Sequence, residues 1–348
     1  MTPTIPRRSL GSTGIALSEL GLGSAPLGNL YETMSDATAR AILDAAVAAG
    51  IRYVDTAPFY GFGLSERRVG DGVRGEHCVI STKVGRLLVP DSSVGDDSMR
   101  FGFRSRLPFK PVFDYSHDAI LRSWEASLQR LGVARVDLLY VHDAGAATHG
   151  AAHPAMWHQL TEGGGFRALQ RLRDERSIDG FGLGVNEIAV CLQAMNYIQV
   201  DALLLAGRYT LLEQGALDEL LPRAKRAGTA VIVGGPYNSG ILAVGTRSKV
   251  PALYNYAPAP AAVMARVARI EAVCERHAIP LAAAALQFPL SHPQVASVIP
   301  GISSVAQLSD TLRFYRVPIP PRFWADLKSE GLLREDAVVP DLENSHPP

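Results

Sequence analysis

The feature that most constrains this chain is the alternation of short apolar runs with longer segments of helical periodicity. The runs are rich in Val, Ile and Leu and lack polar alternation, which predicts strands that are buried on both faces, as in a parallel sheet. Between them, apolar residues recur at helical spacing, for example Ile120, Trp124 and Leu128. The eight predicted strands are residues 20–25, 53–58, 78–84, 136–142, 180–185, 201–207, 230–236 and 295–301.

Eight strand–helix units without a linker between two halves favour the α/β class and one closed (β/α)8 TIM barrel, which we expect to span residues 1–348 as a single domain. The alternative is an open doubly wound sheet, whose dinucleotide fingerprint should follow the first strand. There, Gly21-x-Gly23 leads to Pro26 where the third glycine belongs. The pattern therefore favours the barrel.

The remaining segments lie at the two ends of the chain and in three long connections. Residues 1–19 predict an N-terminal hairpin lid, with Gly11 and Gly14 at its turn. Residues 321–348 predict a C-terminal helix and a loose tail over 340–348. Each long connection follows a strand, so we expect all of them on the C-terminal face, where they would determine substrate specificity. They cover residues 86–115, 143–163 and 240–260.

The charge balance and the cysteine content limit which classes of protein this chain can belong to. Lys+Arg and Asp+Glu both number 34, so no basic surplus is available to neutralise a nucleic acid, and a small-molecule substrate is expected. Cys78, Cys191 and Cys274 form neither a disulfide framework nor a paired metal motif, which is typical of a reducing compartment. No apolar run follows Arg7-Arg8, and none is long enough to span a membrane. We expect a cytoplasmic monomer or small homo-oligomer.

Polar side chains lie at the ends of three predicted strands: Asp55, Lys83 and His142. Because the strand ends of a parallel barrel converge, these side chains are expected to meet at one site. A buried charge is costly unless it is paired, so Asp55 and Lys83 are expected to form an ion pair. Tyr60 lies five residues beyond Asp55 and is close enough to fold back over this pair.

This set of side chains suggests proton transfer. An ammonium beside a phenol favours the phenolate, so Lys83 is expected to lower the pKa of Tyr60 from its usual value of about 10. Tyr60 would then exchange a proton with a carbonyl or hydroxyl oxygen near neutral pH, while His142 orients that oxygen. Proton transfer of this kind naturally accompanies hydride transfer at the same carbon. Tyr209 is a further candidate for the substrate pocket.

In order along the chain, Asp55-Thr-Ala-x-x-Tyr60-Gly, Thr82-Lys83 and Asp137-Leu-Leu-x-Val-His142 resemble the aldo-keto reductase superfamily. The resemblance covers almost the whole chain. It implies a catalytic tetrad of Asp55, Tyr60, Lys83 and His142, with a nicotinamide dinucleotide bound across the barrel mouth.

Segments 82–86, 184–187 and 205–214 are similar to the aldose dehydrogenases of that superfamily. This similarity implies oxidation of an aldose of the L-fucose (D-threo) type at C1 to its lactone, with Tyr60 as the base. Alternative activities are pyridoxal 4-dehydrogenation and NADPH-dependent reduction of an aldehyde or ketone. A nucleotide-binding sensor is the non-enzymatic alternative.

The same resemblance implies where the cofactor would bind. Asn186 matches the residue that binds the nicotinamide carboxamide. At Gly234 the sequence departs from the family, which has an aromatic residue there, so another aromatic is expected to stack on the nicotinamide. NADP-preferring relatives carry Lys and Arg at the positions of Gly301 and Gln307, so NAD is predicted and NADP is the alternative. The other implied contacts are Gly23, Ser24, Asp55, Gly235, Pro236, Tyr237, Ser239, Gly240, Pro300 and Asp310.

Three histidines raise the question of a metal site. His149, His153 and His158 are spaced near helical turns, but they lie in a Gly/Ala-rich loop without a nearby Cys or a persuasive carboxylate ligand. We therefore expect no metal.

Overall fold

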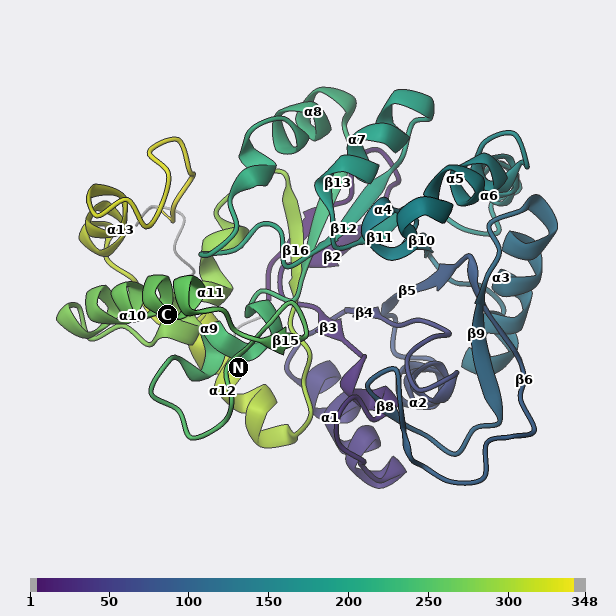
Figure 1. The fold of residues 1–348 in the computed structure, drawn as a ribbon, viewed down its shortest axis with the longest axis horizontal. Helices are drawn as coiled ribbons and strands as arrows, with labels where there is room; N and C mark the ends of the chain where they lie inside the picture. Colours follow the sequence, from purple (N-terminus) through teal and green to yellow (C-terminus); the bar gives the residue numbers. More distant parts are fainter. Residues whose placement is uncertain (1–4, 341–348) are drawn as a thin grey trace.

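The computed structural model describes residues 5–340 and forms a closed parallel barrel (Figure 1). All eight predicted strands are present and pair in chain order. Isolated parallel bridges from Leu20 to Val298 and from Gly23 to Gly301 join the first strand to the last. The predicted TIM barrel is therefore confirmed. Its strands are β3 (Leu22–Gly23), β4 (Tyr53–Asp55), β5 (Val79–Val84), β10 (Leu138–His142), β11 (Gly180–Val185), β12 (Ala202–Ala206), β13 (Ala230–Gly234) and β16 (Val295–Ile299).

Helices surround the barrel and cover the outer faces of its strands (Figure 1). In the first of them, Ala39, Ile42, Leu43 and Ala46 are buried at helical spacing, and the Ser35 side chain caps the start by accepting a hydrogen bond from the Thr38 N–H. The helices of the ring are α1 (Asp36–Ala48), α2 (Leu64–Val73), α3 (His117–Leu131), α6 (Gly165–Asp174), α7 (Ile188–Tyr197), α8 (Leu220–Ala227), α11 (Leu281–Leu290) and α12 (Val305–Tyr315). The helix α10 (Ala261–Arg276) packs against α11 farther from the strands (Figure 1).

The apolar core has two parts because strand residues alternate between the inside and the outside of the barrel. Val54 belongs to the large cluster between strands and helices, whereas its neighbour Tyr53 belongs to the smaller cluster inside the barrel. Both are buried, as expected for strands covered on both faces.

An antiparallel hairpin closes one end of the barrel. It consists of β1 (Arg7–Ser9) and β2 (Ala16–Ser18), and its Leu10 and Leu17 are fully buried in the inner cluster. A Cβ atom at Gly11 would lie 2.5 Å from the carbonyl oxygen of Gly228, just before β13 begins. The hairpin therefore covers the end at which the strands start, opposite the end at which the predicted site residues lie.

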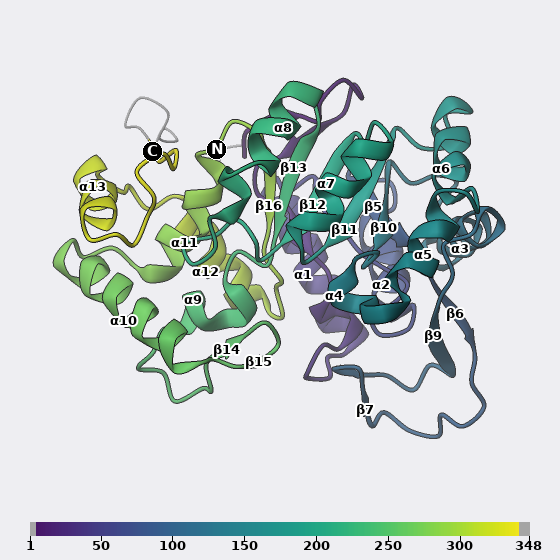
Figure 2. The same cartoon turned by 45° about the horizontal axis from the view of Figure 1, so that its top comes forward.

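The three long connections lie at the other end of the barrel (Figure 2). Residues 86–115 form an arm in which β6 (Arg86–Pro90) pairs with β9 (Phe109–Phe113), and β7 (Met99–Arg100) pairs with β8 (Phe103–Arg104). Residues 143–163 contain α4 (Ala146–His149) and α5 (His153–Leu160). Residues 240–260 contain α9 (Ile241–Val244) and the hairpin of β14 (Leu253–Tyr254) with β15 (Ala257–Pro258).

Short 3-10 helices occur at Pro26–Gly28, Gly150–Ala152, Gly215–Leu217 and Asn238–Gly240. The segment after α12 contains α13 (Pro321–Ser329), and most of the predicted loose tail, residues 341–348, lies outside the described residues. Within residues 5–340, no helix has the length and apolar character needed to cross a membrane.

Candidate active site

Strand register brings the predicted polar residues to one end of the barrel. Asp55 pairs with Ser81 across β4 and β5, Lys83 pairs with Tyr140 across β5 and β10, and His142 pairs with Gly184 across β10 and β11. The absence of a side chain at Gly184 leaves room for the lysine, because a Cβ atom there would lie 3.2 Å from Lys83 Cε.

The predicted ion pair between Asp55 and Lys83 is present and buried. Lys83 Nζ lies 2.6 Å from Asp55 Oδ2 and also donates to the Thr56 carbonyl at 2.9 Å. The Ser81 hydroxyl donates to the other carboxylate oxygen at 2.7 Å. The two charged side chains are only 2% and 3% exposed. Burial alone would lower the pKa of Lys83, but Asp55 and Tyr60 together outweigh burial and the net shift is upward, so the lysine is charged.

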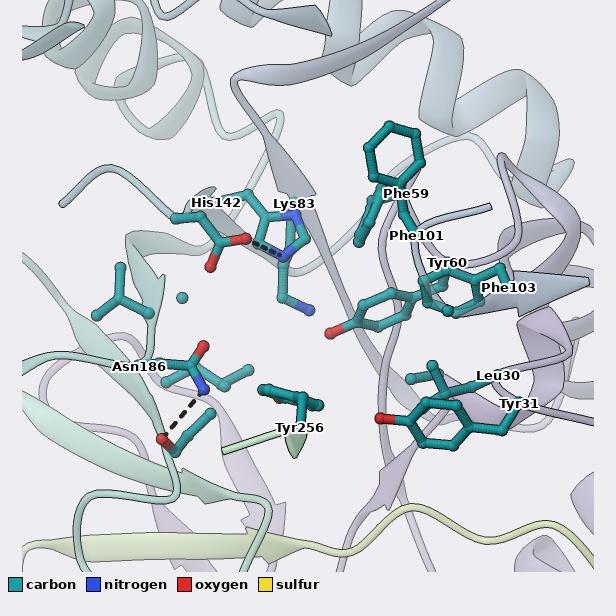
Figure 3. Close-up of a pocket in the computed structure, with 17 residues that line it drawn as sticks. Leu30, Tyr31, Phe59, Tyr60, Lys83, Phe101, Phe103, His142, Asn186 and Tyr256 are labelled. Carbon is teal, nitrogen blue, oxygen red and sulfur yellow. Dashed lines mark hydrogen bonds and ion pairs between the residues drawn. The ribbon is translucent and has the colours of Figure 1, made fainter. Parts of the chain in front are cut away.

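Tyr60 packs beside this ion pair with its hydroxyl toward the cavity (Figure 3). Lys83 Nζ lies 4.7 Å from the centroid of the Tyr60 ring, and the ring stacks on Phe103 at a centroid distance of 6.0 Å. Burial raises the pKa of Tyr60 to about 12, although Lys83 opposes the shift. The predicted lowering of this pKa is therefore wrong for the protein alone. Removal of water destabilises the phenolate more than the nearby ammonium stabilises it.

Two glycines in contact determine where the Tyr60 turn lies. Gly61 has a φ of 65°, and a Cβ atom there would lie 2.3 Å from the Gly28 carbonyl oxygen. A Cβ atom at Gly28 would lie 2.6 Å from the carbonyl carbon of Tyr60. No other residue type fits at either position unless the turn that carries Tyr60 moves.

Gly28→Ala is therefore expected to displace Tyr60. We expect the free energy of unfolding to fall by about 1–3 kcal/mol, as for other overpacked sites, together with a loss of turnover. Denaturant unfolding and steady-state kinetics measure the two effects. Gly95→Ala is the matched control, because a Cβ atom there meets nothing within 4 Å. Wild-type stability and turnover in Gly28→Ala would contradict this interpretation.

His142 is buried in neutral form beside the tyrosine. Burial lowers its pKa well below the ordinary value, and the cations of Lys83 and Arg86 lower it further. Nδ1 has no hydrogen-bond partner in the described part of the chain, whereas Nε2 lies 3.5 Å from Asp143 Oδ2 (Figure 3). Because an ionised carboxylate only accepts hydrogen bonds, we assign the ring proton to Nε2. The Tyr60 hydroxyl and the His142 Nε2–H thus provide two donors beside a cation.

These groups line a cavity of about 440 Å³ whose other walls are mainly apolar, with aromatic and aliphatic side chains. The 86–115 arm is joined to the segment before α1 by an antiparallel bridge between Leu30 and Phe103. The aromatic residues of the wall are Tyr31, Phe59, Phe101, Phe103 and Tyr256. Sequence reasoning did not assign these residues to the site, although two phenylalanines within a long connection were an available signal.

Of the predicted cofactor residues, one lines the cavity and three others follow β13 with backbone that is open to a ligand. Asn186 lines the cavity, and within the described residues its carboxamide donates a single long hydrogen bond, of 3.5 Å, to the Ala206 carbonyl. Gly235 is exposed directly after β13, with a φ of 56°. Ser239 and Gly240 follow with φ values of 62° and 106°, and a Cβ atom at Gly240 would meet nothing within 4 Å. An amide partner and open backbone of this kind fit a carboxamide and a pyrophosphate.

Other predicted cofactor residues serve the fold. A Cβ atom at Gly23 would lie 3.1 Å from the Ile299 carbonyl oxygen, so this glycine allows the barrel to close. Ser24 is buried, with its hydroxyl 2.7 Å from that of Ser65. Gln307 Oε1 accepts a hydrogen bond from the Ser303 N–H at the start of α12.

The remaining members of the predicted set do not line the cavity. Asp310 forms an ion pair with Arg313 at 2.9 Å. Gly301 is exposed beside Pro26. Pro236 and Pro300 are buried after their strands, and Tyr237 packs against the outer core.

Tyr209 is placed in the core rather than in the cavity. It is fully buried, and its ring packs against Phe288 at a centroid distance of 5.3 Å. The structure therefore does not bring Tyr209 together with Tyr60 and His142. Within residues 5–340, no group of three or more His, Cys, Asp or Glu side chains is arranged to hold a metal ion.

Comparison with known proteins gives consistent matches over the whole barrel. The aldo/keto reductase family model matches residues 19–330. The chain is 45% identical to pyridoxal 4-dehydrogenase of Microbacterium luteolum, covering 94% of this chain and 98% of that protein. It is 36% identical to D-threo-aldose 1-dehydrogenase of Pseudomonas sp, covering 96% and 99%.

Solved structures support the fold. An aldo-keto reductase from Bacillus halodurans in its holo form superposes with a TM-score of 0.72 at 22% identity, covering 97% of this chain and 99% of that one. Glycerol dehydrogenase from Gluconobacter oxydans gives a TM-score of 0.70 at 20% identity, covering 94% and 95%.

Proposed function

Because this chain belongs to the aldo/keto reductase family and is therefore an oxidoreductase, we propose that it oxidises the hemiacetal carbon of a cyclic hydroxyaldehyde to a lactone, with NAD as cofactor. The observation that carries this proposal is the meeting of the Tyr60 hydroxyl, the His142 Nε2–H and the Lys83 ammonium at one wall of the cavity. Two donors and a cation suit a carbon whose oxygen changes between hydroxyl and carbonyl.

Each side chain has a distinct role in this reaction. A bound nicotinamide supplies the hydride acceptor. The Asn186 carboxamide would hold its amide, and the backbone at Gly235 and Gly240 would accommodate the pyrophosphate. His142 donates a hydrogen bond to the substrate oxygen, and Tyr60 takes the hydroxyl proton as the carbon becomes a carbonyl.

The pKa of Tyr60 determines how the reaction depends on pH. Since this pKa is about 12, Tyr60 must first release its own proton, so oxidation gains rate as the pH rises. In the reverse direction the protonated phenol is already the required acid.

Two substrate classes share this chemistry. An aldose of the L-fucose (D-threo) type is supported by the 36% identical aldose dehydrogenase. Pyridoxal is the second candidate and is supported by the 45% identical pyridoxal dehydrogenase. Pyridoxal closes on its own hydroxymethyl group to a cyclic hemiacetal, as a sugar does, so one site can oxidise either to a lactone.

The test follows the absorbance of reduced nicotinamide with a panel of L-fucose, D-arabinose, L-galactose, D-glucose and pyridoxal. Turnover of L-fucose-like sugars supports the aldose dehydrogenase, and turnover of pyridoxal alone supports the second candidate. No turnover of any member, with nucleotide binding retained, overturns the hemiacetal reaction.

NAD is expected to bind at least about tenfold more tightly than NADP. The positions at which NADP-preferring relatives carry cations are occupied here by Gly301 and Gln307, with Asp310 nearby, and the Gln307 side chain already accepts a hydrogen bond from the Ser303 N–H. Titration calorimetry with each nucleotide measures the ratio. Gln307→Arg is expected to tighten NADP binding more than NAD binding, and a wild-type preference for NADP would reverse this assignment.

A further inference from the structure

A carboxylate that the proposed chemistry does not use lies in the cavity wall beside the catalytic histidine. Asp143 directly follows His142 and has a φ of 53°, a left-handed conformation that Asp tolerates better than most residues. Its N–H donates to the Gly184 carbonyl at 3.0 Å. Of the described residues that line the cavity, Asp143 is the only Asp or Glu.

An arginine behind the wall fixes this carboxylate in place. Arg86 Nη1 donates to Asp143 Oδ2 at 3.0 Å, and the guanidinium lies over the Phe59 ring, 3.2 Å from its centroid. The guanidinium also lies 4.8 Å from the centroid of the Phe113 ring. The arginine and aspartate side chains are only 12% and 19% exposed. Burial raises the pKa of Asp143 and Arg86 opposes this shift, while the arginine, packed against two aromatic rings, holds the carboxylate in a fixed position.

Only one carboxylate oxygen is used within the protein. Oδ2 accepts from Arg86, whereas Oδ1 accepts no hydrogen bond from residues 5–340. In the protein alone Oδ1 is still reached by solvent, so a ligand that displaces this water must supply a donor in its place, because leaving a charged acceptor unpaired and out of water costs free energy. The ligand that fills the cavity is the available source of that donor.

The spacing indicates which part of the ligand supplies it. Asp143 Oδ2 lies 3.5 Å from His142 Nε2, so the carboxylate, with its free Oδ1, and the histidine donor are close enough to contact two oxygens on adjacent carbons of one substrate. When the oxygen on the reacting carbon accepts the Nε2–H, the hydroxyl on the next carbon therefore lies against the carboxylate. This inference rests on the aldose candidate of the proposed function, because the carbon next to the aldehyde of pyridoxal carries no hydroxyl. We propose that Asp143 accepts a hydrogen bond from the neighbouring hydroxyl and so selects 2-hydroxyaldehydes and their cyclic forms over plain aldehydes.

The test compares substrates that differ only in that hydroxyl. In oxidation the pair is D-arabinose and 2-deoxy-D-ribose, and in reduction it is lactaldehyde and propanal. For each pair we expect the wild-type kcat/KM to favour the hydroxylated member about 10- to 100-fold, the value of a hydrogen bond to a charged group. In Asp143→Gly the ratio is expected to approach one, and in Asp143→Asn to fall to an intermediate value.

Both variants suit the left-handed backbone at this position, so they are expected to fold. Asp179→Asn is the matched control: this aspartate pairs with Arg135 and lies just before β11, at the opposite end of the barrel, so the ratio should stay at the wild-type value.

The outcomes separate this inference from the function on which it rests. Equal kcat/KM for both members of a pair in the wild type, or an unchanged ratio in Asp143→Gly, overturns the role of Asp143 and leaves the dehydrogenase standing. Reduction of the aldehydes without oxidation of any sugar or of pyridoxal overturns the dehydrogenase, and the lactaldehyde and propanal ratio still decides the role of Asp143. No turnover of any of these compounds overturns both.

Discussion

Tyr60→Phe is expected to lower kcat by about 10²- to 10⁴-fold, the usual contribution of a positioned acid or base. The change removes only the hydroxyl that exchanges the proton, while the ring keeps its contacts with Phe103 and His142. Nucleotide binding is expected to remain at the wild-type level, because Asn186 and the backbone after β13 are untouched. Steady-state kinetics and titration calorimetry on the same preparation measure both quantities.

Tyr197→Phe is the control for this change. Tyr197 is 50% exposed at the end of α7, so losing its hydroxyl should alter neither turnover nor binding. Wild-type turnover in Tyr60→Phe would refute the proposed role of the phenol. A wild-type protein that binds nucleotide without turning over any sugar, aldehyde or ketone would instead support the nucleotide-binding sensor.

Lys83→Met is expected to lower the free energy of unfolding by about 3–5 kcal/mol, because it leaves the buried carboxylate of Asp55 without its counter-charge. The lysine is almost fully enclosed, and its hydrogen bonds to Asp55 and to the Thr56 carbonyl are lost together. Turnover is also expected to fall, since Tyr60 loses the only opposing influence on its raised pKa. Denaturant unfolding at neutral pH gives the stability change.

The double variant Asp55→Asn/Lys83→Met separates the two effects. Neutralising both partners removes the unpaired charge, so most of the lost stability should return while turnover stays low. If Lys83→Met alone unfolds at the wild-type denaturant concentration, the buried pair does not stabilise the fold.

The barrel was predictable because its strands carry their signal locally. An uninterrupted apolar run such as 180–185 cannot lie at a wet surface, and eight such runs with helices between them leave few arrangements. The positions at which strands end were predicted less accurately. The run at 53–58 stops pairing at Asp55, because the chain turns there to bring Tyr60 back over Lys83. The polar residues at strand ends were predictable because each of them directly ends an apolar run in the sequence.

The walls of the cavity and the behaviour of Tyr60 were not predictable from local pattern. Phe101 and Tyr256 meet the site only because two connections that are distant in sequence fold over the same barrel end. The sign of the Tyr60 pKa shift depends on how much water the surrounding rings exclude, and the spacing of residues along the sequence does not show this. Tyr209 has the right residue type, but packing against α11 takes it into the core.

The site has a floor of strand ends and a roof of connections, and these two parts respond differently to sequence change. The floor is held by the barrel register, so Asp55, Lys83 and His142 change only at the expense of the fold. The roof is held by contacts between the connections themselves, such as the bridge between Leu30 and Phe103, and not by the barrel register. Substitutions in the roof can therefore reassign the substrate over short evolutionary distances while the reaction stays the same. An ancestral barrel with these strand-end residues could have given rise to oxidoreductases for a vitamin and for a sugar without any change in the catalytic side chains.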